Sequence, residues 1–270
     1  MNNKIYKYIP MNLNAIRLLV TGHLYLATPS SLNDPFESEF EFEKMEVLPD
    51  IDFLKKIFLN KKVEVNKINQ DNFYPYLKEL LKDRQEDEYG ITCFSEVKDD
   101  ILMWSYYADS HRGICLEFDK DKIVKSGVIR AIDLKLENIK PLSEVPKVKI
   151  IEDENGLSFE EEDISLWKFP HWSNEKEIRL HGNLSNYRNI KNGKVKRTIP
   201  FDKESLTGVY LGERISVEDE VLLAHLVNKH RDLQHIKWYK AKKDLQKSVM
   251  QFDNYIVKIV ESIEVNIVHK

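Results

Sequence analysis

The stretch Met103-Trp-Ser-Tyr-Tyr-Ala-Asp-Ser-His-Arg-Gly-Ile-Cys-Leu-Glu-Phe118 predicts a helix that is followed closely by a strand. Asp99 or Asp100 can cap the helix, because a short carboxylate side chain accepts hydrogen bonds from the first free backbone N–H groups. Gly113 is the residue type that commonly follows a helix end. The apolar run 114–118 then has the composition of a strand. We therefore expect one helix and one strand here, joined by a short turn.

The aromatic and titratable side chains of this stretch divide into a predicted core and a predicted rim. Trp104 and Tyr107 can share one helix face, and aromatic residues at this spacing are more often core than a stacking platform. We assign Trp104 to the core and keep both interpretations open for Tyr106, Tyr107 and His111. His111 and Arg112 fall at or just past the helix end, where the helix dipole favours a cation and where both can reach a ligand. Tyr107, His111 and Arg112 are therefore candidate binding residues.

Further strands and helices are expected on both sides of this stretch. On the N-terminal side the pattern predicts a strand at 5–8, a helix at 13–20, a strand at 24–28 and a loop at 29–35. Two helices at 53–58 and 73–81 and a strand at 90–95 are expected to follow. On the C-terminal side the pattern is mostly extended over 128–200. A strand is expected at 209–212. A helix is expected at 216–227, where Ser216 and Asp219 form a capping box, and a strand of alternating apolar and polar residues is expected at 255–268.

The order of these elements predicts an α+β fold. The apolar fraction of 42% in 270 residues is enough for a sizeable core. Strands and helices are mixed without the regular alternation of a doubly wound parallel sheet, and no Gly/Ser-rich linker interrupts them. We expect a single domain over 1–270 with a mainly antiparallel sheet at its core. The helices within 50–88 are expected to form a small helical insertion in it.

Composition also limits the classes of function. The net charge is -4, with 41 basic and 45 acidic residues interspersed, so neither a nucleic-acid-coating nor a membrane-seeking surface is expected. Cys93 and Cys115 lie in apolar, strand-like runs and are expected to be free thiols, although a lone disulfide between neighbouring strands stays open. No run approaches the 18 apolar residues of a membrane span, and the N-terminus lacks the apolar region of a signal peptide. A soluble, cytoplasmic protein is expected.

Several common site motifs are missing from the sequence. It contains no G-x-G-x-x-G, Walker loop, H-E-x-x-H or G-x-S-x-G. It also contains no C-x-x-C pair, which argues against a structural zinc site. We therefore expect no resident metal.

The segment Trp172-Ser-Asn-Glu-Lys-Glu-Ile-Arg-Leu180 is the first candidate for chemistry. Side chains alternate along a strand, so Glu175, Glu177 and Arg179 would share one face. The two carboxylates would lie about 6 to 7 Å apart. Like charges at this distance and a neighbouring guanidinium move the two pKa values apart, which suits acid/base chemistry. From spacing alone, a solvent-facing strand that carries a Glu–Arg pair is the favoured alternative.

The segment Leu32-Asn-Asp-Pro-Phe-Glu37 is the second candidate. The side chains of Asn33 and Asp34 can bond to nearby backbone and hold a tight turn. Pro35 favours an extended backbone at Asp34. A polar loop at the mouth of a site and a structural Asx-turn are equally compatible with this pattern.

The chain resembles a widespread bacterial family, domain of unknown function 2971. The resemblance lies in motifs distributed along most of the sequence: Tyr6-Lys-Tyr8, Gly22-His-Leu-Tyr25, Asn33-Asp-Pro-Phe-Glu37, Cys93-Phe-Ser95, Met103-Trp-Ser-Tyr-Tyr-Ala108, His111-Arg-Gly113 and Glu175-Lys-Glu-Ile-Arg179. This family brings little established chemistry with it.

The order of elements is also similar to that of ADP-ribosyltransferases, at the level of the fold. That resemblance implies that Glu177 (or Glu175) holds the ribose and stabilises positive charge on the sugar as nicotinamide leaves. It further implies that Tyr106 or Tyr107 stacks on nicotinamide, and that the protein is an NAD-dependent effector in toxin action or phage defence. The chain departs from the pattern at its first strand, which has Tyr6 and Tyr8 where His or Arg is usual. The candidate NAD-binding residues are Tyr8, Asn33, Asp34, Ser95, Tyr107, His111, Arg112 and Arg179.

Two other classes of function stay open. A metal-dependent nuclease would use hard oxygen ligands, together with Lys176, and its carboxylates would need to converge on one ion. The candidate ligands are Asp34, Glu37, Glu117, Glu175 and Glu177. A non-enzymatic sensor or interaction domain would instead use the aromatic stretch as core and binding groove, with the charged strand exposed to solvent. A small-molecule nucleotide is the expected partner in the enzymatic case, and the acceptor, protein or nucleic acid, stays undefined.

Overall fold

The computed structural model describes residues 3–47, 49–50, 52, 54–55, 67–153, 156–160, 164–189, 192–247 and 249–255. Helices and strands are mixed, and the larger sheet is mainly antiparallel, so the fold is α+β as the sequence predicted. The chain forms two compact units from interleaved segments. Unit 1 contains Met1–Tyr25, Cys93–Ala131 and Thr198–Lys270, and unit 2 contains Leu26–Thr92 and Ile132–Arg197.

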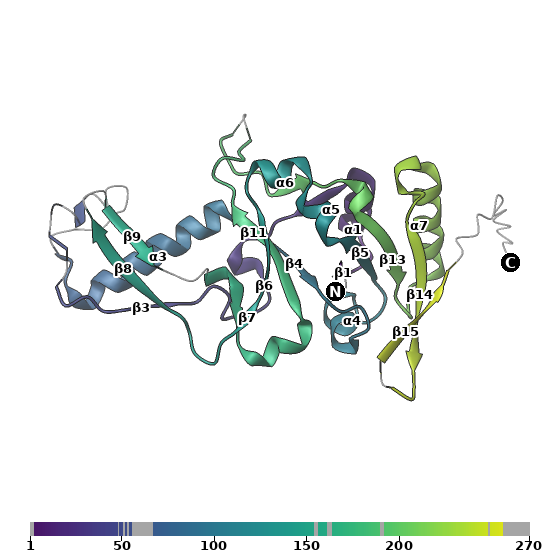
Figure 1. Cartoon of the computed structure of the whole chain (residues 1–270), viewed down its shortest axis with the longest axis horizontal. Coiled ribbons are helices and arrows are strands. Elements are labelled where there is room, and N and C mark those ends of the chain that lie inside the picture. The colour runs from purple at the N-terminus through teal and green to yellow at the C-terminus, as the bar shows by residue number, and fades with distance from the viewer. Residues whose placement is uncertain are drawn as a thin grey trace, which may run out of the picture. The chain divides into compact units, whose positions relative to one another are not determined.

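Unit 1 is built around the strand β1 (Lys4–Ile9), which has a neighbour on each side. It pairs antiparallel with β5 (Ile114–Asp119), with Tyr8 opposite Cys115, and with the end of β4 (Tyr89–Ser95), with Tyr6 opposite Ser95. The sheet continues beyond β5 through β13 (Leu206–Leu211), β14 (Lys237–Asp244) and β15 (Val249–Asn254) (Figure 1). Only the β13–β14 pair in this series is parallel.

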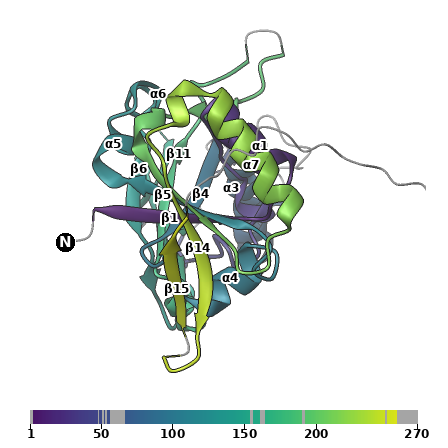
Figure 2. The same cartoon turned by 90° about the vertical axis from the view of Figure 1, so that its right-hand side faces the viewer.

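The helices of unit 1 begin and end at residues that the sequence made recognisable. In α1 (Leu13–Thr21), the N–H of Gly22 donates to Leu18 O from a left-handed backbone at φ 64°. In α4 (Ile101–Tyr107), the Asp100 side chain accepts from two backbone N–H groups. In α7 (Val217–Lys229), Ser216 accepts from Asp219 N. This last helix provides the crossover that the parallel strands β13 and β14 require (Figure 2).

The smaller elements of unit 1 complete its surface. They are β2 (His23–Tyr25), which pairs antiparallel with β12 (Thr198–Pro200), and the short helices α5 (Lys120–Val124), α6 (Gly127–Ala131), η5 (Lys203–Ser205) and η6 (Arg231–Leu233).

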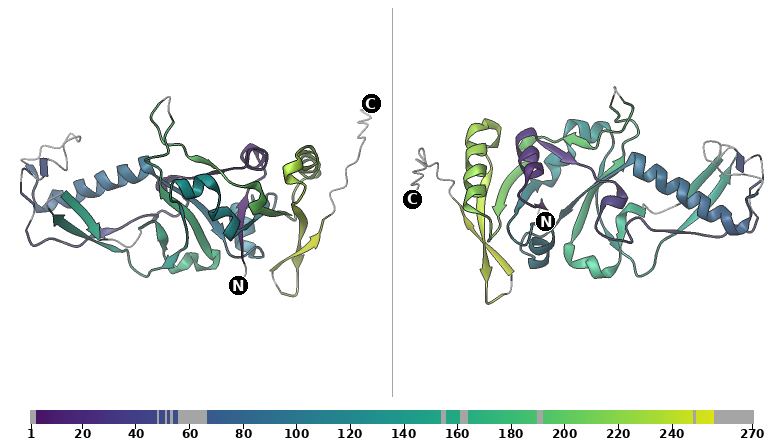
Figure 3. Two further views of the ribbon diagram at one scale, coloured as in Figure 1. Left: turned by 45° about the horizontal axis from the view of Figure 1, so that its top comes forward. Right: turned by 180° about the vertical axis from the view of Figure 1, so that it is seen from behind.

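Unit 2 contains a helix packed on a small sheet, and it also carries two charged strands that belong to the larger sheet. The helix α3 (Gln70–Glu88) lies beside the strand β8 (Lys147–Asp153) (Figure 3). Phe73 and Leu77 of α3 pack with Ile150 of β8. The strand β8 lies between β3 (Glu41–Phe42) and β9 (Gly156–Glu160). The strand β11 (Glu177–Asn183) pairs antiparallel with β6 (Lys135–Asn138), and β7 (Lys140–Pro141) pairs with β10 (Trp167–Lys168). The 3-10 turns are η1 (Pro29–Ser31), η3 (Ile164–Leu166) and η4 (Pro170–Glu175).

The predicted helix after Asp100 ends earlier than the sequence suggested. It stops at Tyr107, because Asp109, Ser110 and His111 all take left-handed backbone conformations, with φ of 47°, 52° and 70°. Three such residues in a row are incompatible with a right-handed helix. The chain then turns sharply into β5, and a Cβ atom at Gly113 would lie only 2.3 Å from Ile9 O.

Other sequence-based expectations have varied outcomes. The helix expected at 73–81 is confirmed within α3. Most of the helix expected at 53–58, and nearly all of the strand expected at 255–268, lie outside the described residues. Of the insertion expected within 50–88, the described residues belong to unit 2. Cys93 and Cys115 are both free thiols. Within the described ranges, every helix is too short or too polar to span a lipid bilayer.

Candidate functional site

The ten candidate site residues divide between the two units. Unit 1 holds Tyr8, Ser95, Tyr107, His111 and Arg112, and unit 2 holds Asn33, Asp34, Glu175, Glu177 and Arg179.

The charged face of β11 is buried, which corrects the expectation of a solvent-facing pair. Arg179 is 0% exposed and Glu177 is 7% exposed. Arg179 Nε donates to Glu177 Oε1 at 2.7 Å, while Nη1 and Nη2 donate to the two carboxylate oxygens of Glu37 at 2.6 and 2.7 Å. Nη1 also donates to the backbone oxygen of Ser165. Burial is tolerated because a bidentate carboxylate and a second acceptor satisfy the guanidinium.

Glu175 does not belong to the strand, although its alternation with Glu177 had suggested that it would. It ends the 3-10 turn η4, and Lys176 follows in a left-handed conformation at φ 44°, so β11 begins only at Glu177. The two carboxylates nevertheless meet. Lys168 Nζ lies 2.9 Å from Glu175 Oε2 and 2.6 Å from Glu177 Oε2. One buried ammonium is thus shared by both predicted catalytic carboxylates.

Lys168 is held in its charged form by these partners. Burial disfavours the ammonium, but the carboxylates of Glu177 and Glu175 outweigh this effect and raise the pKa of Lys168. The ammonium also lies 5.1 Å from the centre of the Trp172 ring, which adds a cation–π contact. We name the set Glu37, Arg179, Glu177, Lys168 and Glu175 the buried charge network.

The Asn33–Glu37 loop contributes to this network through its last residue. The Asx-turn, one of the two interpretations that the sequence left open, is present, because Phe36 N donates to Asp34 Oδ1 at 2.9 Å. Asp34 is buried at 4% exposure, whereas Asn33 is exposed. Asp34 Oδ2 is buried and has no hydrogen-bond partner among the described residues. The loop therefore presents Glu37, rather than Asn33 or Asp34, to the charged face of β11.

Two of the candidate residues in unit 1, Tyr8 and Ser95, are buried in its core. Tyr8 donates to Val97 O at 2.9 Å and its ring lies edge-on to Trp104 at 5.3 Å. Burial raises the pKa of Tyr8 far above its ordinary value. Ser95 is 0% exposed, and its hydroxyl accepts from Val97 N. Tyr107 packs, half-buried, against the same aromatic cluster.

His111 and Arg112 occupy different environments at the end of α4. Arg112 is exposed and pairs with Asp109 at 3.0 Å. His111 stacks on Trp104 with an interplanar angle of 9°, and its Nε2 lies 3.1 Å from the Ser105 hydroxyl. Burial and the nearby Arg214 lower the pKa of His111. Trp104 itself is 0% exposed, which confirms its assignment to the core.

The carboxylates proposed as metal ligands do not form a recognisable ion site in the described parts of the chain. There, no group of three or more His, Cys, Asp or Glu side chains is arranged to hold a metal ion. Glu117 belongs to unit 1, where it accepts from Thr207 and Tyr210 at 2.7 Å each. The carboxylates of Glu37, Glu175 and Glu177 are instead bound by Arg179 and Lys168.

Two polar residues that lie near the charged face of β11, His181 and Lys168, were not identified from the sequence. His181 lies two positions beyond Arg179, so strand alternation would have placed it on the face of Glu177 and Arg179. It is 1% exposed and contacts Tyr89 and Glu137. Lys168 sits in a strand of two residues and carries no comparable signal.

Comparison with known proteins supports the family but no activity. Residues 103–180 match the family described as protein of unknown function (DUF2971), which confirms the resemblance seen in the motifs. The matched span contains both the Met103–Ala108 motif of α4 and the Glu175–Arg179 motif of the buried charge network. No curated protein and no solved structure matches the chain. The resemblance to ADP-ribosyltransferases gains no support from these comparisons.

Proposed function

We propose that this chain is an enzyme that acts on a nucleotide, with NAD as the candidate substrate and ADP-ribosyl transfer as the candidate reaction. The supporting observation is that Glu175 and Glu177 share one ammonium, Lys168 Nζ, at 2.9 and 2.6 Å. Lys168 can remain paired with Glu175 while it releases Glu177. The network can thus free one carboxylate without leaving a buried ammonium unpaired, which would be costly.

In the proposed reaction the freed Glu177 carboxylate lies beside the ribose of NAD. The bond between ribose C1′ and nicotinamide breaks, a nucleophile of the acceptor bonds to C1′, and the acceptor loses a proton. Positive charge develops on the sugar in between, and a carboxylate fixed nearby stabilises it. Arg179 acts as a positioning residue, because it fixes Glu177 Oε1 at 2.7 Å.

Nicotinamide release from NAD tests this proposal directly. Glu177→Gln keeps the size of the side chain and removes its charge, so release should fall by at least about 100-fold if the carboxylate stabilises the transition state. Glu175→Gln should reduce release less, since it changes only the partner of Lys168. Glu144→Gln, at an exposed position of unit 2, is the matched control.

The outcome is informative in both directions. If the wild-type protein releases no nicotinamide with any protein or nucleic-acid acceptor offered, the NAD proposal is abandoned. If Glu177→Gln loses release only in proportion to its loss of folded protein, Glu177 is structural.

A non-enzymatic interaction domain is the second candidate, and the burial of the charge network favours it. Arg179 is 0% exposed and bonds to Glu177, Glu37 and Ser165, which also suits a purely structural joint. On this alternative, Glu177→Gln destabilises unit 2 and changes no reaction. The nuclease alternative is tested by adding Mg²⁺ or Mn²⁺ with single- and double-stranded nucleic acid, where cleavage that a chelator abolishes supports it.

We also place the protein in the bacterial cytoplasm, as a toxin or phage-defence component. The two free cysteines are compatible with a reducing compartment. Expression in a bacterial host with and without phage challenge tests this role, with Glu177→Gln as the comparison. An unchanged phage yield and unchanged growth would count against it.

A further inference from the structure

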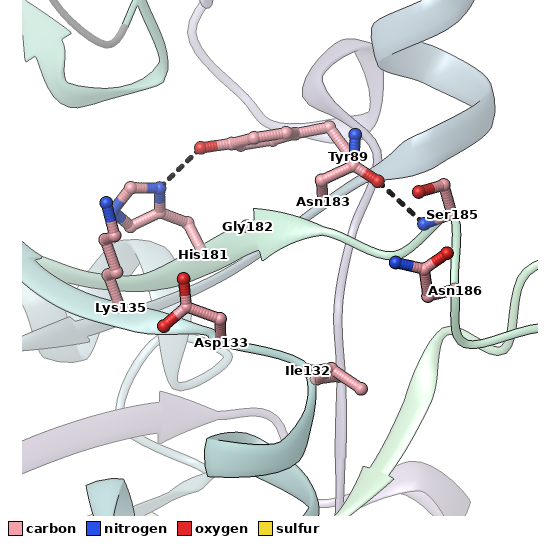
Figure 4. A pocket seen from close by; sticks show the side chains of 9 residues that line it. All are labelled: Tyr89, Ile132, Asp133, Lys135, His181, Gly182, Asn183, Ser185 and Asn186. Carbon is pink, nitrogen blue, oxygen red and sulfur yellow. Dashed lines mark hydrogen bonds between the residues drawn. The ribbon is translucent and has the colours of Figure 1, made fainter.

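A polar hollow of about 380 Å³ lies in unit 2 beside the end of β11 (Figure 4). Its lining includes the aromatic hydroxyl of Tyr89, the imidazole of His181 and the ammonium-bearing Lys135. Asn183, Ser185 and Asn186 line the opposite part, and Ser185 N donates to Asn183 Oδ1. Hydrogen-bonding groups of several kinds thus face a space large enough for a small metabolite.

Tyr89, His181 and Glu137 form a hydrogen-bonded relay at one wall of this hollow. His181 Nδ1 lies 2.6 Å from the Tyr89 hydroxyl, and His181 Nε2 lies 3.0 Å from Glu137 Oε2. The Ser165 hydroxyl donates to the Tyr89 oxygen at 3.1 Å and also lies 3.4 Å from His181 Nδ1. In a relay through these groups, the Tyr89 proton points to His181 Nδ1. His181 Nε2 then carries a proton and donates it to the carboxylate. A hydroxyl, an imidazole and a carboxylate in this order are the parts of a proton relay.

The three groups differ in burial. His181 is 1% exposed, which shields the imidazole from bulk water, whereas the Glu137 side chain is 47% exposed. Tyr89 is half-buried and borders the hollow, so a ligand there can approach this member of the relay. The backbone at Gly182 is closely packed, since a Cβ atom there would lie 2.8 Å from Leu134 Cδ2. This packing fixes the wall that carries His181.

The charges of the hollow indicate the kind of molecule that would fit. Lys135 is exposed, lines the hollow and has no ion-pair partner within the part of the chain that the structure describes. It can therefore bind an anionic group of a ligand. Asp133 also lines the hollow and offers a carboxylate, which binds hydroxyl groups well and repels a second anion. The amides of Asn183 and Asn186 add both donors and acceptors.

We propose that this hollow binds a small polyhydroxylated molecule with one anionic group, of the sugar-phosphate class, and that Tyr89 exchanges a proton with it. A ligand hydroxyl gives its proton to the Tyr89 oxygen as the Tyr89 proton passes to His181 Nδ1. The resulting imidazolium is stabilised by Glu137. One proton moves from the ligand to His181, the ligand oxygen is left as an alkoxide, and no electrons are exchanged. The site does not depend on Glu177 or on NAD.

Nuclear magnetic resonance of the full chain with ¹⁵N-labelled histidine tests the relay in the wild-type protein and in one variant. We expect the tautomer of His181 that carries its proton on Nε2. Tyr89→Phe should remove this preference and bring the ring nitrogens towards a mixture of tautomers. A proton on Nδ1 in the wild-type protein would overturn the relay, because Tyr89 could then not donate to that atom.

Ligand binding is tested with ribose 5-phosphate, ribose and inorganic phosphate as separate probes. Ribose 5-phosphate should shift the His181 resonances at saturation, and ribose and phosphate should each bind at least tenfold more weakly. Binding of phosphate as tightly as ribose 5-phosphate would mean that the hollow takes a simple anion and would overturn the sugar-phosphate assignment. Unchanged His181 resonances with all three probes would overturn the site.

Substitution of the cation provides the matched control. Lys135→Ala should weaken ribose 5-phosphate binding by about tenfold or more, as expected when a charge-assisted hydrogen bond is lost. Lys194→Ala removes another exposed lysine of the same unit that does not line the hollow, and should leave binding unchanged. Equal weakening by both substitutions would show non-specific attraction and contradict the site.

Discussion

Trp104 in unit 1 and Arg179 in unit 2 are both 0% exposed, yet their surroundings differ completely. Trp104 lies among rings, with Tyr8 edge-on at 5.3 Å, and its one polar atom donates to Lys98 O at 2.8 Å. Arg179 is surrounded by the carboxylates of Glu37 and Glu177. In the sequence both residues belonged to similar mixtures of apolar and titratable residues. Equal burial therefore says little about how a side chain is stabilised.

The difference predicts how each unit responds to substitution. An aromatic interior loses stability roughly with the volume removed, because packing is the main contribution. A buried charge network loses stability when one partner is removed, because the remaining charge has no compensation. Unit 2 should thus be more sensitive to changes of charge and unit 1 to changes of volume.

Arg179→Met should have the largest effect. It removes both contacts of Glu37 and one of Glu177, and the loss in the free energy of unfolding should approach about 5 kcal/mol, the upper end for breaking a buried ion pair. Urea unfolding, monitored by hydrogen exchange of backbone amides in unit 2, measures this loss. Arg188→Met, at an exposed arginine of unit 2, is the control and should change stability by less than about 1 kcal/mol. Equal losses for the two variants would remove the distinction drawn between the units.

Trp104→Ala should follow, with a loss of about 3–4 kcal/mol from the cavity that it leaves among the rings of unit 1. Tyr106→Ala lies on the same helix at 63% exposure and should be close to neutral. Hydrogen exchange in β1 and β5 reports the effect. Trp104→Phe should recover more than half of the loss, and if it is as damaging as alanine, packing volume is not what stabilises this unit.

Tyr8→Phe tests the hydrogen bond of a residue that the sequence made a candidate for ligand binding. The ring is retained and the hydrogen bond to Val97 O is lost, so stability should fall by about 1 kcal/mol. Thermal unfolding measures this change. A negligible change in stability together with a lost ligand response would return Tyr8 to the list of binding residues.

The smallest effect concerns pH and His111. Its folded pKa lies below the unfolded value, mainly through burial and then Arg214, so the unfolded chain binds more protons at acid pH. Stability should therefore fall as the pH drops below about 6.5, the ordinary pKa of histidine, towards the lower folded pKa. His111→Asn tolerates the left-handed backbone and should flatten this dependence between about pH 7 and pH 5. His225→Asn in the same unit is the control, and an unchanged pH dependence in His111→Asn contradicts the assignment.

Local signals in the sequence predicted the helix ends better than the site. Gly22, Asp100 and Ser216 each act within a few residues of their own position, so capping could be inferred from neighbours alone. The partner of Arg179 could not be inferred in this way, because Glu37 lies 142 positions away. Alternation placed Glu177 and Arg179 on one face but could not indicate that this face is buried. The left-handed Lys176 also breaks the strand alternation between Glu175 and Glu177, and no sequence rule signals such a conformation at a lysine.

The interleaved segments of the two units also set the order in which they can be completed during synthesis. All of unit 2 has been translated once Arg197 is added, whereas unit 1 still lacks β13, β14 and β15 at that moment. Glu37 and Arg179 are therefore both present on the nascent chain before the sheet of unit 1 can close on β13. Domains generally fold as units on the ribosome. We expect unit 2 to be the first part of the nascent chain to resist proteolysis, although the first residues to be translated belong to unit 1.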